Sequence, residues 1–394
     1  MSKAFELPVS PTMGSLQLSM TLGITAQAKA MIAAGEDVAN MCAGEPDFDT
    51  PEHIKDAAIE ALRRGDTKYT PESGKQELRK AIAAKLEKEN GIPGTFEQVI
   101  VGCGAKFSVF SAVAALCGPG DEVVIPSPYW LSYPEMVKAA GATPIFVATR
   151  VEDNFCITAD ELKAVLTPRT KLLILNSPSN PTGGMASRQS LEAIAALAVE
   201  RNFMVLADEI YEKLTYDPGC GHVSIASFNP EIRSRTITVN GFSKSYSMTG
   251  WRLGYLSAPL WLAKRIAALQ SHTTSNPTSF AQAGALAALL GTQEPVAHMR
   301  KAFAQRRDLI HGLLQEIPGM KLFKPQGAFY IFPDISKFGI GSIPFCERLL
   351  KEARVAAIPG LPFGADKHIR FSYACSAANI EKACERLKEF CARL

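Results

Sequence analysis

The hydrophobic positions from residue 99 onward fall into short apolar runs separated by longer stretches of helix-forming residues. The short runs, rich in Val, Ile and Leu, predict strands at residues 99–101, 122–125, 143–147, 171–176 and 203–207. The longer stretches predict helices at residues 107–117, 159–166 and 187–200. Because strands and helices alternate, the pattern favours an α/β fold with a mainly parallel sheet wrapped by helices.

The two ends of the chain have a different pattern. Residues up to about 19 lack a sustained period and predict an extended arm, after which come a helix at 26–34, a short strand at 37–42 and a helix at 52–64. After Gly254 the chain is expected to turn helical, at residues 261–270, 281–290 and 294–316. The last hundred residues predict short strands at 329–332, 355–358 and 369–373 and a closing amphipathic helix at 377–394.

These patterns predict a division of the chain into domains. We expect a large domain over residues 46–290 and a smaller α+β domain over residues 291–394. Residues 1–45 would supply an N-terminal arm and part of the small domain.

Composition narrows the class of protein. The 394 residues are 47% hydrophobic and 21% charged, as in an ordinary globular protein. The net charge of +3, without any basic run, disfavours a nucleic-acid partner. There is no apolar span of about 18 residues, which disfavours membrane insertion. Nine cysteines without a Cys-x-x-Cys pair indicate free thiols in a reducing, cytoplasmic compartment and predict no metal site.

Two positions suggest chemistry on their own. The glycine turn Gly102-Cys-Gly-Ala-Lys106 precedes a predicted helix, and free amides at a helix N-terminus favour a bound phosphate. Phe107 stands where a dinucleotide-binding fingerprint requires its third glycine, which argues against a nicotinamide cofactor. Asp208 ends a strand that is apolar throughout, so it is either a helix cap or a site residue at the carboxyl edge of the sheet.

The most informative stretch is Asn240-Gly-Phe-Ser-Lys-Ser-Tyr-Ser-Met-Thr-Gly-Trp-Arg-Leu-Gly254. A lone Ser-Lys pair is in most sequences an exposed loop lysine. The whole stretch, however, closely resembles the lysine segment of the pyridoxal-phosphate aminotransferases of fold type I. The resemblance implies that Lys244 carries the cofactor as a Schiff base and moves the substrate proton, with Ser243 and Arg252 at the cofactor phosphate.

Further motifs resemble the same family in the same order, and they imply the rest of the cofactor site. Gly104, Ala105 and Lys106 would offer their amides to the phosphate, and Trp130 would stack on the pyridine ring. In Phe-Met-Val-Leu-Ala-Asp-Glu-Ile-Tyr the carboxylate of Asp208 would keep the ring nitrogen protonated, and Tyr211 would bond the phenolic oxygen.

The resemblance also implies the substrate-binding residues. Asn180 lies in Asn-Ser-Pro-Ser-Asn-Pro-Thr-Gly, which has a Ser where the family has Asn, and it would contact both cofactor and substrate. Arg370 would clamp the substrate α-carboxylate, with Trp130 and the Gly44 backbone beside it. Lys106 would bind a distal carboxylate, accompanied by Thr21 where prephenate is used.

One motif implies a shared site. Tyr69 lies in Lys-Tyr-Thr-Pro, which resembles the loop whose tyrosine reaches across a dimer to the neighbouring phosphate. The alternative for Tyr69 is a partly buried loop tyrosine that caps its own domain.

Together these resemblances imply a fold type I pyridoxal-phosphate transferase with a mainly parallel seven-stranded sheet, working as a homodimer. The matched subgroup is that of the bacterial and plastid-type aspartate or aspartate/prephenate aminotransferases. It implies transfer of an amino group between aspartate or glutamate and oxaloacetate, 2-oxoglutarate or prephenate. A carbon–sulfur lyase of the same fold, or an aminotransferase for aromatic or other amino acids, is the alternative. A cofactor-sensing regulator would need a DNA-binding domain, for which the chain before the first motif is too short.

Overall fold

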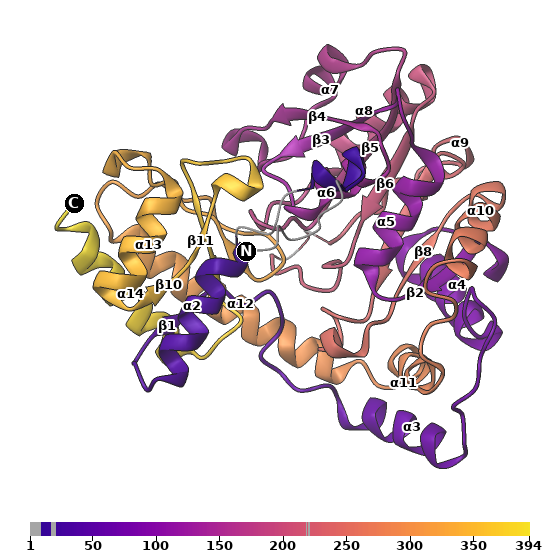
Figure 1. Ribbon diagram of the computed structural model, residues 1–394, viewed down its shortest axis with the longest axis horizontal. Coiled ribbons are helices and arrows are strands. Elements are labelled where there is room, and N and C mark those ends of the chain that lie inside the picture. The colour runs from indigo at the N-terminus through magenta and orange to yellow at the C-terminus, as the bar shows by residue number, and fades with distance from the viewer. Residues whose placement is uncertain (1–8, 17–20, 218, 220) are drawn as a thin grey trace, which may run out of the picture.

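The structure is a computed structural model that describes residues 9–16, 21–217, 219 and 221–394. A seven-stranded sheet forms the centre of its larger part (Figure 1). Neighbouring strands along the sheet are β2 Val99–Gly102, β8 Gly254–Ser257, β7 Thr236–Gly241, β6 Met204–Asp208, β5 Thr170–Asn176, β3 Glu122–Ser127 and β4 Thr143–Ala148. Only β8 runs antiparallel to its neighbours, so the expected mainly parallel sheet is confirmed.

Both faces of this sheet are buried because its strands are apolar at successive positions. On β5, Leu172 and Ile174 join the core under one layer of helices, whereas Leu173 and Leu175 join the core under the other. The first layer contains α5 Ala105–Leu116, α6 Ser132–Ala139 and α10 Leu260–Ser271. The second contains α7 Ala159–Val165, α8 Arg188–Arg201 and α9 Pro230–Arg233.

The smaller part of the protein is built from segments near both ends of the chain. Strand β1 Ala39–Asn40 pairs in parallel with β10 Val355–Ala356. A separate antiparallel sheet contains, in order, β11 Ile358–Pro359, β12 Ile369–Ser372 and β9 Tyr330–Ile331. In Figure 1 the indigo helix α2 Thr21–Ala33 lies beside the yellow-to-orange helices, and all share one apolar core with α12 Glu294–Gln315, α13 Ser342–Ala353 and α14 Ala377–Cys391. These contacts support the predicted small domain, although the boundaries at residues 45 and 290 remain predictions.

The remaining helices are α1 Pro11–Gly14, α3 Glu52–Arg63, α4 Gln76–Asn90 and α11 Ser279–Leu290. Helix α1 lies within the segment that the sequence predicted as an extended arm, so that prediction is wrong for these four residues. The expectation that the chain turns helical after Gly254 is also wrong, because strand β8 comes first. The sequence pattern did not reveal α4, α6 or α13. Among the residues that the structure describes, no helix has the length and apolar character needed to span a bilayer.

Candidate active site

A pocket of about 530 Å³ opens at the carboxyl ends of the central strands. Its walls come from both parts of the protein, from Gly44 near one end of the chain to Arg370 near the other. Most of the side chains predicted from the sequence line it, namely Gly44, Ala105, Lys106, Trp130, Asn180, Asp208, Tyr211, Ser243, Lys244, Arg252 and Arg370.

Asp208 is the last residue of the buried strand β6 and is 4% exposed. Its Oδ2 accepts a hydrogen bond of 2.7 Å from the Tyr133 hydroxyl, and its Oδ1 accepts one of 3.3 Å from the amide of Ile210. Burial raises the pKa of Asp208 to about 6, although the Tyr133 hydroxyl opposes this rise. The carboxylate therefore stands in an apolar setting that favours a cationic or proton-donating partner.

Lys244 follows strand β7 and extends its amine into the pocket. The amine donates a hydrogen bond to the carbonyl oxygen of Gly44 and lies about 6 Å from the ring of Tyr211. Among the described residues it has no ion pair within 4.0 Å. Burial lowers the pKa of Lys244 to about 8, against the attraction of Glu45. Such an amine can act as a nucleophile or as a proton carrier near neutral pH.

Arg370 on β12 lies deep in the pocket, 7% exposed. Its Nη1 donates to Asn180 Oδ1 at 2.9 Å, and its guanidinium lies 4.4 Å from the ring centroid of Tyr330. Its Nε atom is buried and has no hydrogen-bond partner within the described part of the chain. The Tyr330 hydroxyl in turn lies 2.9 Å from the hydroxyl of Tyr211. A planar guanidinium held in this way is suited to a bidentate contact with a carboxylate.

The glycine turn before α5 forms a cradle for an anion. Gly104 has a φ of +86°, and a Cβ there would lie 2.6 Å from Nη2 of Arg252. Strand β8 also approaches closely, since a Cβ on Gly254 would lie 2.2 Å from the amide nitrogen of Ala105. Glycine at both positions therefore lets the free amides of the helix N-terminus and the Arg252 guanidinium meet at one place.

Lys106 and Trp130 form another wall of the pocket. The Lys106 ammonium lies 5.0 Å from the centroid of the indole ring. Burial lowers the pKa of Lys106, and the nearby charge of Arg252 lowers it further. Lys106 has no carboxylate partner among the described residues, and such a cation in a pocket wall is available to an anionic ligand.

Two of the predicted residues that the structure describes, Gly104 and Tyr69, are not part of the pocket wall. Gly104 supports the cradle from behind it, and Tyr69 is 92% exposed on a loop outside the pocket. The side chain of Thr21 lies outside the described residues, although the helix α2 begins at this position. The prediction for Thr21 therefore stays a prediction.

Sequence reasoning missed several residues of the wall. They are Glu45, Leu131, Ser132, Tyr133, Asn176, Ile210, Thr249 and Tyr330. Thr249 lies inside the lysine segment quoted for Lys244, and its hydroxyl donates a hydrogen bond of 2.7 Å to the carboxylate of Glu45. Tyr133 and Tyr330 carried no signal, because only the fold brings their hydroxyls to Asp208 and Tyr211.

Comparison with known proteins gives a consistent result. Residues 36–387 match the family "Aminotransferase class I and II". The chain is 47% identical to the aspartate aminotransferase of Geobacillus stearothermophilus, over 98% of this chain and 99% of that protein. It is 44% identical to the aspartate/prephenate aminotransferase of Cereibacter sphaeroides, with the same two coverages.

A solved structure has the same fold. It is that of the Thermus thermophilus aspartate aminotransferase with maleate, at a TM-score of 0.94 and 42% identity. The match covers 98% of this chain and 100% of that one.

Proposed function

Since the chain belongs to the aminotransferase class I and II family, whose members depend on pyridoxal phosphate, we propose that its substrates are dicarboxylic. It is a pyridoxal-phosphate-dependent aminotransferase. The proposed donors are aspartate and glutamate, and the proposed acceptors are oxaloacetate, 2-oxoglutarate and prephenate. One observation carries this proposal: the pocket holds two separate cations, Arg370 and Lys106, besides Lys244 and the cradle at Arg252.

The residues of the pocket fit the cofactor. Asp208 is a buried carboxylate that suits the protonated ring nitrogen, since burial has already raised its pKa to about 6. The cradle of Gly104, Ala105 and Arg252, with Ser243 beside it in the pocket wall, suits the phosphate. The proposal further assigns Trp130 to the ring face and Tyr211 to the phenolic oxygen. The amide of Lys106 would join the cradle.

The chemistry then divides between cofactor and protein. When bound, the cofactor supplies a sink for the electron pair left at the substrate α-carbon. Lys244 would hold the cofactor and, once the substrate has displaced it, its free amine would take the proton from the substrate α-carbon and later give it back. Its pKa of about 8 supports this role, because a useful fraction of the amine is neutral near pH 7.

The protein also orients the substrate. In the proposal, Arg370 and Asn180 bind the α-carboxylate, with the Gly44 backbone beside them, and their contact of 2.9 Å supports a prearranged clamp. Lys106 binds the distal carboxylate, and Thr21 accompanies it when prephenate is the acceptor. The names of the relatives from G. stearothermophilus and C. sphaeroides support aspartate as a substrate, and the second name also supports prephenate.

We also propose that the working form is a cytoplasmic homodimer. Tyr69 is 92% exposed in the single chain, which supports a role in the partner subunit's site. The eight described cysteines are free, which supports a reducing compartment. The alternatives, a carbon–sulfur lyase or an aminotransferase for aromatic or other amino acids, are not favoured by these relatives.

The test is a scan of amino donors and 2-oxo acid acceptors with the purified holoenzyme. We expect aspartate and glutamate to give the highest kcat/KM values, with oxaloacetate, 2-oxoglutarate or prephenate as acceptor. Higher values for aromatic donors, or the release of ammonia and sulfide from cysteine-type substrates, would favour the alternatives instead.

A further inference from the structure

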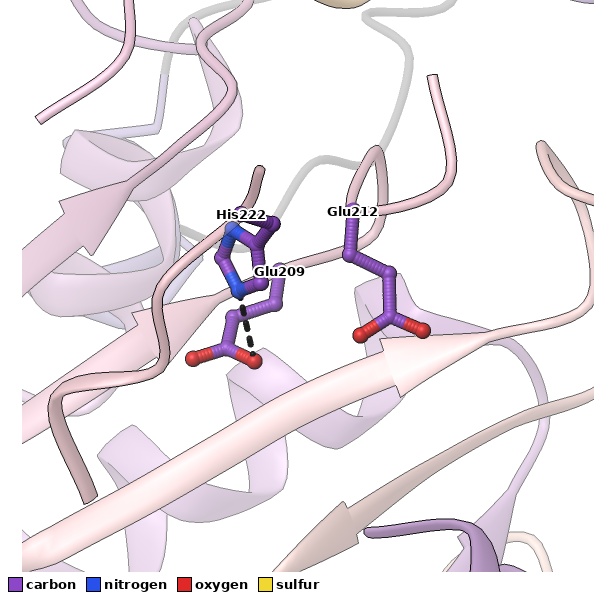
Figure 2. Close-up of side chains that lie close together, drawn as sticks. All are labelled: Glu209, Glu212 and His222. Atoms are coloured by element: carbon purple, nitrogen blue, oxygen red, sulfur yellow. Dashed lines mark ion pairs between the residues drawn. The ribbon is translucent and has the colours of Figure 1, made fainter. Parts of the chain in front are cut away.

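A cluster of buried ionisable side chains lies next to the pocket but outside its wall. Figure 2 shows the carboxylate of Glu209, just after β6, against the ring of His222, with Glu212 beside them. The His222 Nε2 atom lies 3.0 Å from Glu209 Oε2, and these two side chains are 8% and 3% exposed. One ligand atom from each of the three residues lies within 4.8 Å of the others, a spacing typical of a metal site.

A fourth residue occupies the place of a cation in this cluster. The ammonium of Lys85, on helix α4, hydrogen-bonds to the carboxylate of Glu212 and lies 2.8 Å from Asn90 Oδ1. Its side chain is 8% exposed. The two carboxylates therefore face Lys85 and His222; burial lowers the pKa of His222, but Glu209 and Glu212 raise it on balance, and a metal ion would have to displace the lysine.

Neutral side chains also donate hydrogen bonds to the two carboxylates. The Asn90 amide nitrogen donates to Glu212 Oε2 at 2.6 Å and lies 3.2 Å from Glu209 Oε2. The hydroxyl of Ser224 donates to Glu209 Oε2 at 2.6 Å. The turn after β6 is thus tied by its side chains to α4 and to the segment at residues 222–224.

The end of β6 and the same turn carry two residues of the proposed cofactor site. Asp208 and Tyr211 line the pocket, whereas Glu209 and Glu212, each the next residue in the chain, do not. The backbone between them is one tight turn, in which the Glu212 amide donates to the Glu209 carbonyl at 2.9 Å. A movement of either glutamate would therefore move its neighbour in the pocket.

We propose that Glu209 and Glu212, held by Lys85 and His222, are positioning residues that fix the Asp208 carboxylate and the Tyr211 hydroxyl against the cofactor ring. This proposal rests on the proposed function. Replacing a buried ion pair by apolar residues is often neutral for stability or stabilising, so stability alone does not account for the cluster. Precise placement of two groups that set the protonation of a cofactor does account for it.

The test uses the Glu212→Gln and His222→Gln variants of the holoenzyme. The visible absorbance of the bound cofactor is titrated with pH, because its midpoint reports on the groups at the ring nitrogen and phenolic oxygen. We expect the midpoint to move by about half a pH unit or more in both variants. We also expect single-turnover removal of the α-proton to slow roughly tenfold, as small misplacements do.

The control is Glu122→Gln, which disturbs a comparable carboxylate at the start of β3, where Arg169 and Thr167 bind it. It should lower the melting temperature of the protein but leave the absorbance midpoint unchanged. An unmoved midpoint in both cluster variants would overturn the proposal. If Glu212→Gln does not fold, His222→Gln carries the test, since it leaves both carboxylates with their other partners.

A separate experiment tests whether Lys85, and not a metal ion, is the cation of the cluster. Dialysis of the wild-type holoenzyme against a chelator should leave the midpoint unchanged, and a change would overturn the assignment of Lys85 as the cation. The midpoint does not depend on which amino donor the enzyme accepts. Failure of the positioning proposal and failure of the substrate proposal therefore give different results.

Discussion

The pocket contains two cations for the carboxylates of a substrate, Arg370 and Lys106, and their side chains are held in different ways. Arg370 is buried and already hydrogen-bonded to Asn180, so its orientation is fixed before a ligand arrives. Lys106 makes a cation–π contact with Trp130 and has no carboxylate partner among the residues that the structure describes, and burial lowers its pKa. Selectivity among substrates that share an α-carboxylate should therefore depend on Lys106 rather than on Arg370.

Removing the Lys106 ammonium should change selectivity more than catalysis in general. We expect Lys106→Ala to weaken kcat/KM for aspartate and glutamate by roughly 1.5–3 kcal/mol, the scale of one charge-assisted bond, and to change it little for uncharged amino acids. Steady-state kinetics on both classes checks this. Lys80→Ala is the control, because Lys80 also lies over an aromatic ring, Phe96, but outside the pocket. Equal losses for aspartate and alanine would show that Lys106 is structural.

A second prediction at this scale concerns Asp208. We expect Asp208→Ala to keep detectable cofactor binding while the removal of the α-proton slows severely, because the ring nitrogen loses its partner. Stopped-flow single-turnover measurements with aspartate would follow the step directly. An unchanged rate would count against the role assigned to this carboxylate.

Among the secondary-structure elements, β8 was the hardest to predict from the sequence. Its four residues begin with a glycine, and its place is set by pairing with β7 and with β2, which lies far away in the chain. Strands β5 and β6, in contrast, can be recognised from their own apolar residues, without knowledge of the strands they pair with. Lys244, Asp208 and Arg370 were predicted because motifs surround them, whereas Tyr133 and Tyr330 depend on contacts between elements.

Strand β8 lies so close to helix α5 that position 254 requires a glycine, and a substitution there tests this. A methyl group there would lie 2.2 Å from the Ala105 amide, so Gly254→Ala should push the strand and the helix apart. We expect a loss of about 1–3 kcal/mol in the free energy of unfolding and weaker cofactor binding. Denaturant unfolding and cofactor titration check both effects. Gly250→Ala is the control, because a Cβ there has no neighbour within 4 Å, and an equal loss in both variants would contradict the argument.

The stabilisation that His222 contributes to the segment at residues 222–224 should depend on pH. Burial lowers the pKa of His222, but Glu209 and Glu212 more than offset this, against Lys85, and the result is a raised pKa. A raised folded-state pKa means that the stabilisation is complete below the unfolded value of about 6.5 and is lost as pH rises through the folded value.

The melting temperature of the wild type should therefore exceed that of His222→Gln most at about pH 5.5, and the difference should shrink toward about pH 8.5. Thermal unfolding of both proteins across this range is the measurement. The exposed His272 supplies a control, His272→Gln, for which no such trend is expected. A difference that grows with pH would contradict the assignment of charge in the cluster.

The molecule as a whole assembles its pocket from segments that are distant in sequence. Gly44 and Glu45 come from the start of the chain, Lys244 from its middle and Arg370 from the smaller part. The exposed Tyr69 belongs to none of these walls in the single chain. For the molecule as a whole, we therefore propose that a second subunit completes the site.

Hybrid dimers test this proposal. An inactive Tyr69 variant mixed with Lys244→Ala should regain part of the activity, because one of the two sites in each hybrid would contain an intact Lys244 and an intact partner Tyr69. Recovery should approach half of the wild-type activity for each hybrid dimer. Each variant refolded alone is the control. Verified hybrids without any recovered activity would indicate self-contained sites.

The antiparallel strand β8 has a consequence for the order in which the protein can be made. Strand β2 and the glycine turn that follows it reach the sheet only through β8, which lies between β2 and β7. A ribosome must therefore translate residues 254–257 before residues 99–102 find their place. Until then β2 stays unpaired, since sequence-distant pairing is slow and leaves strand edges exposed. Nascent chains that end before Gly254 should therefore be the forms of this protein that most need a chaperone.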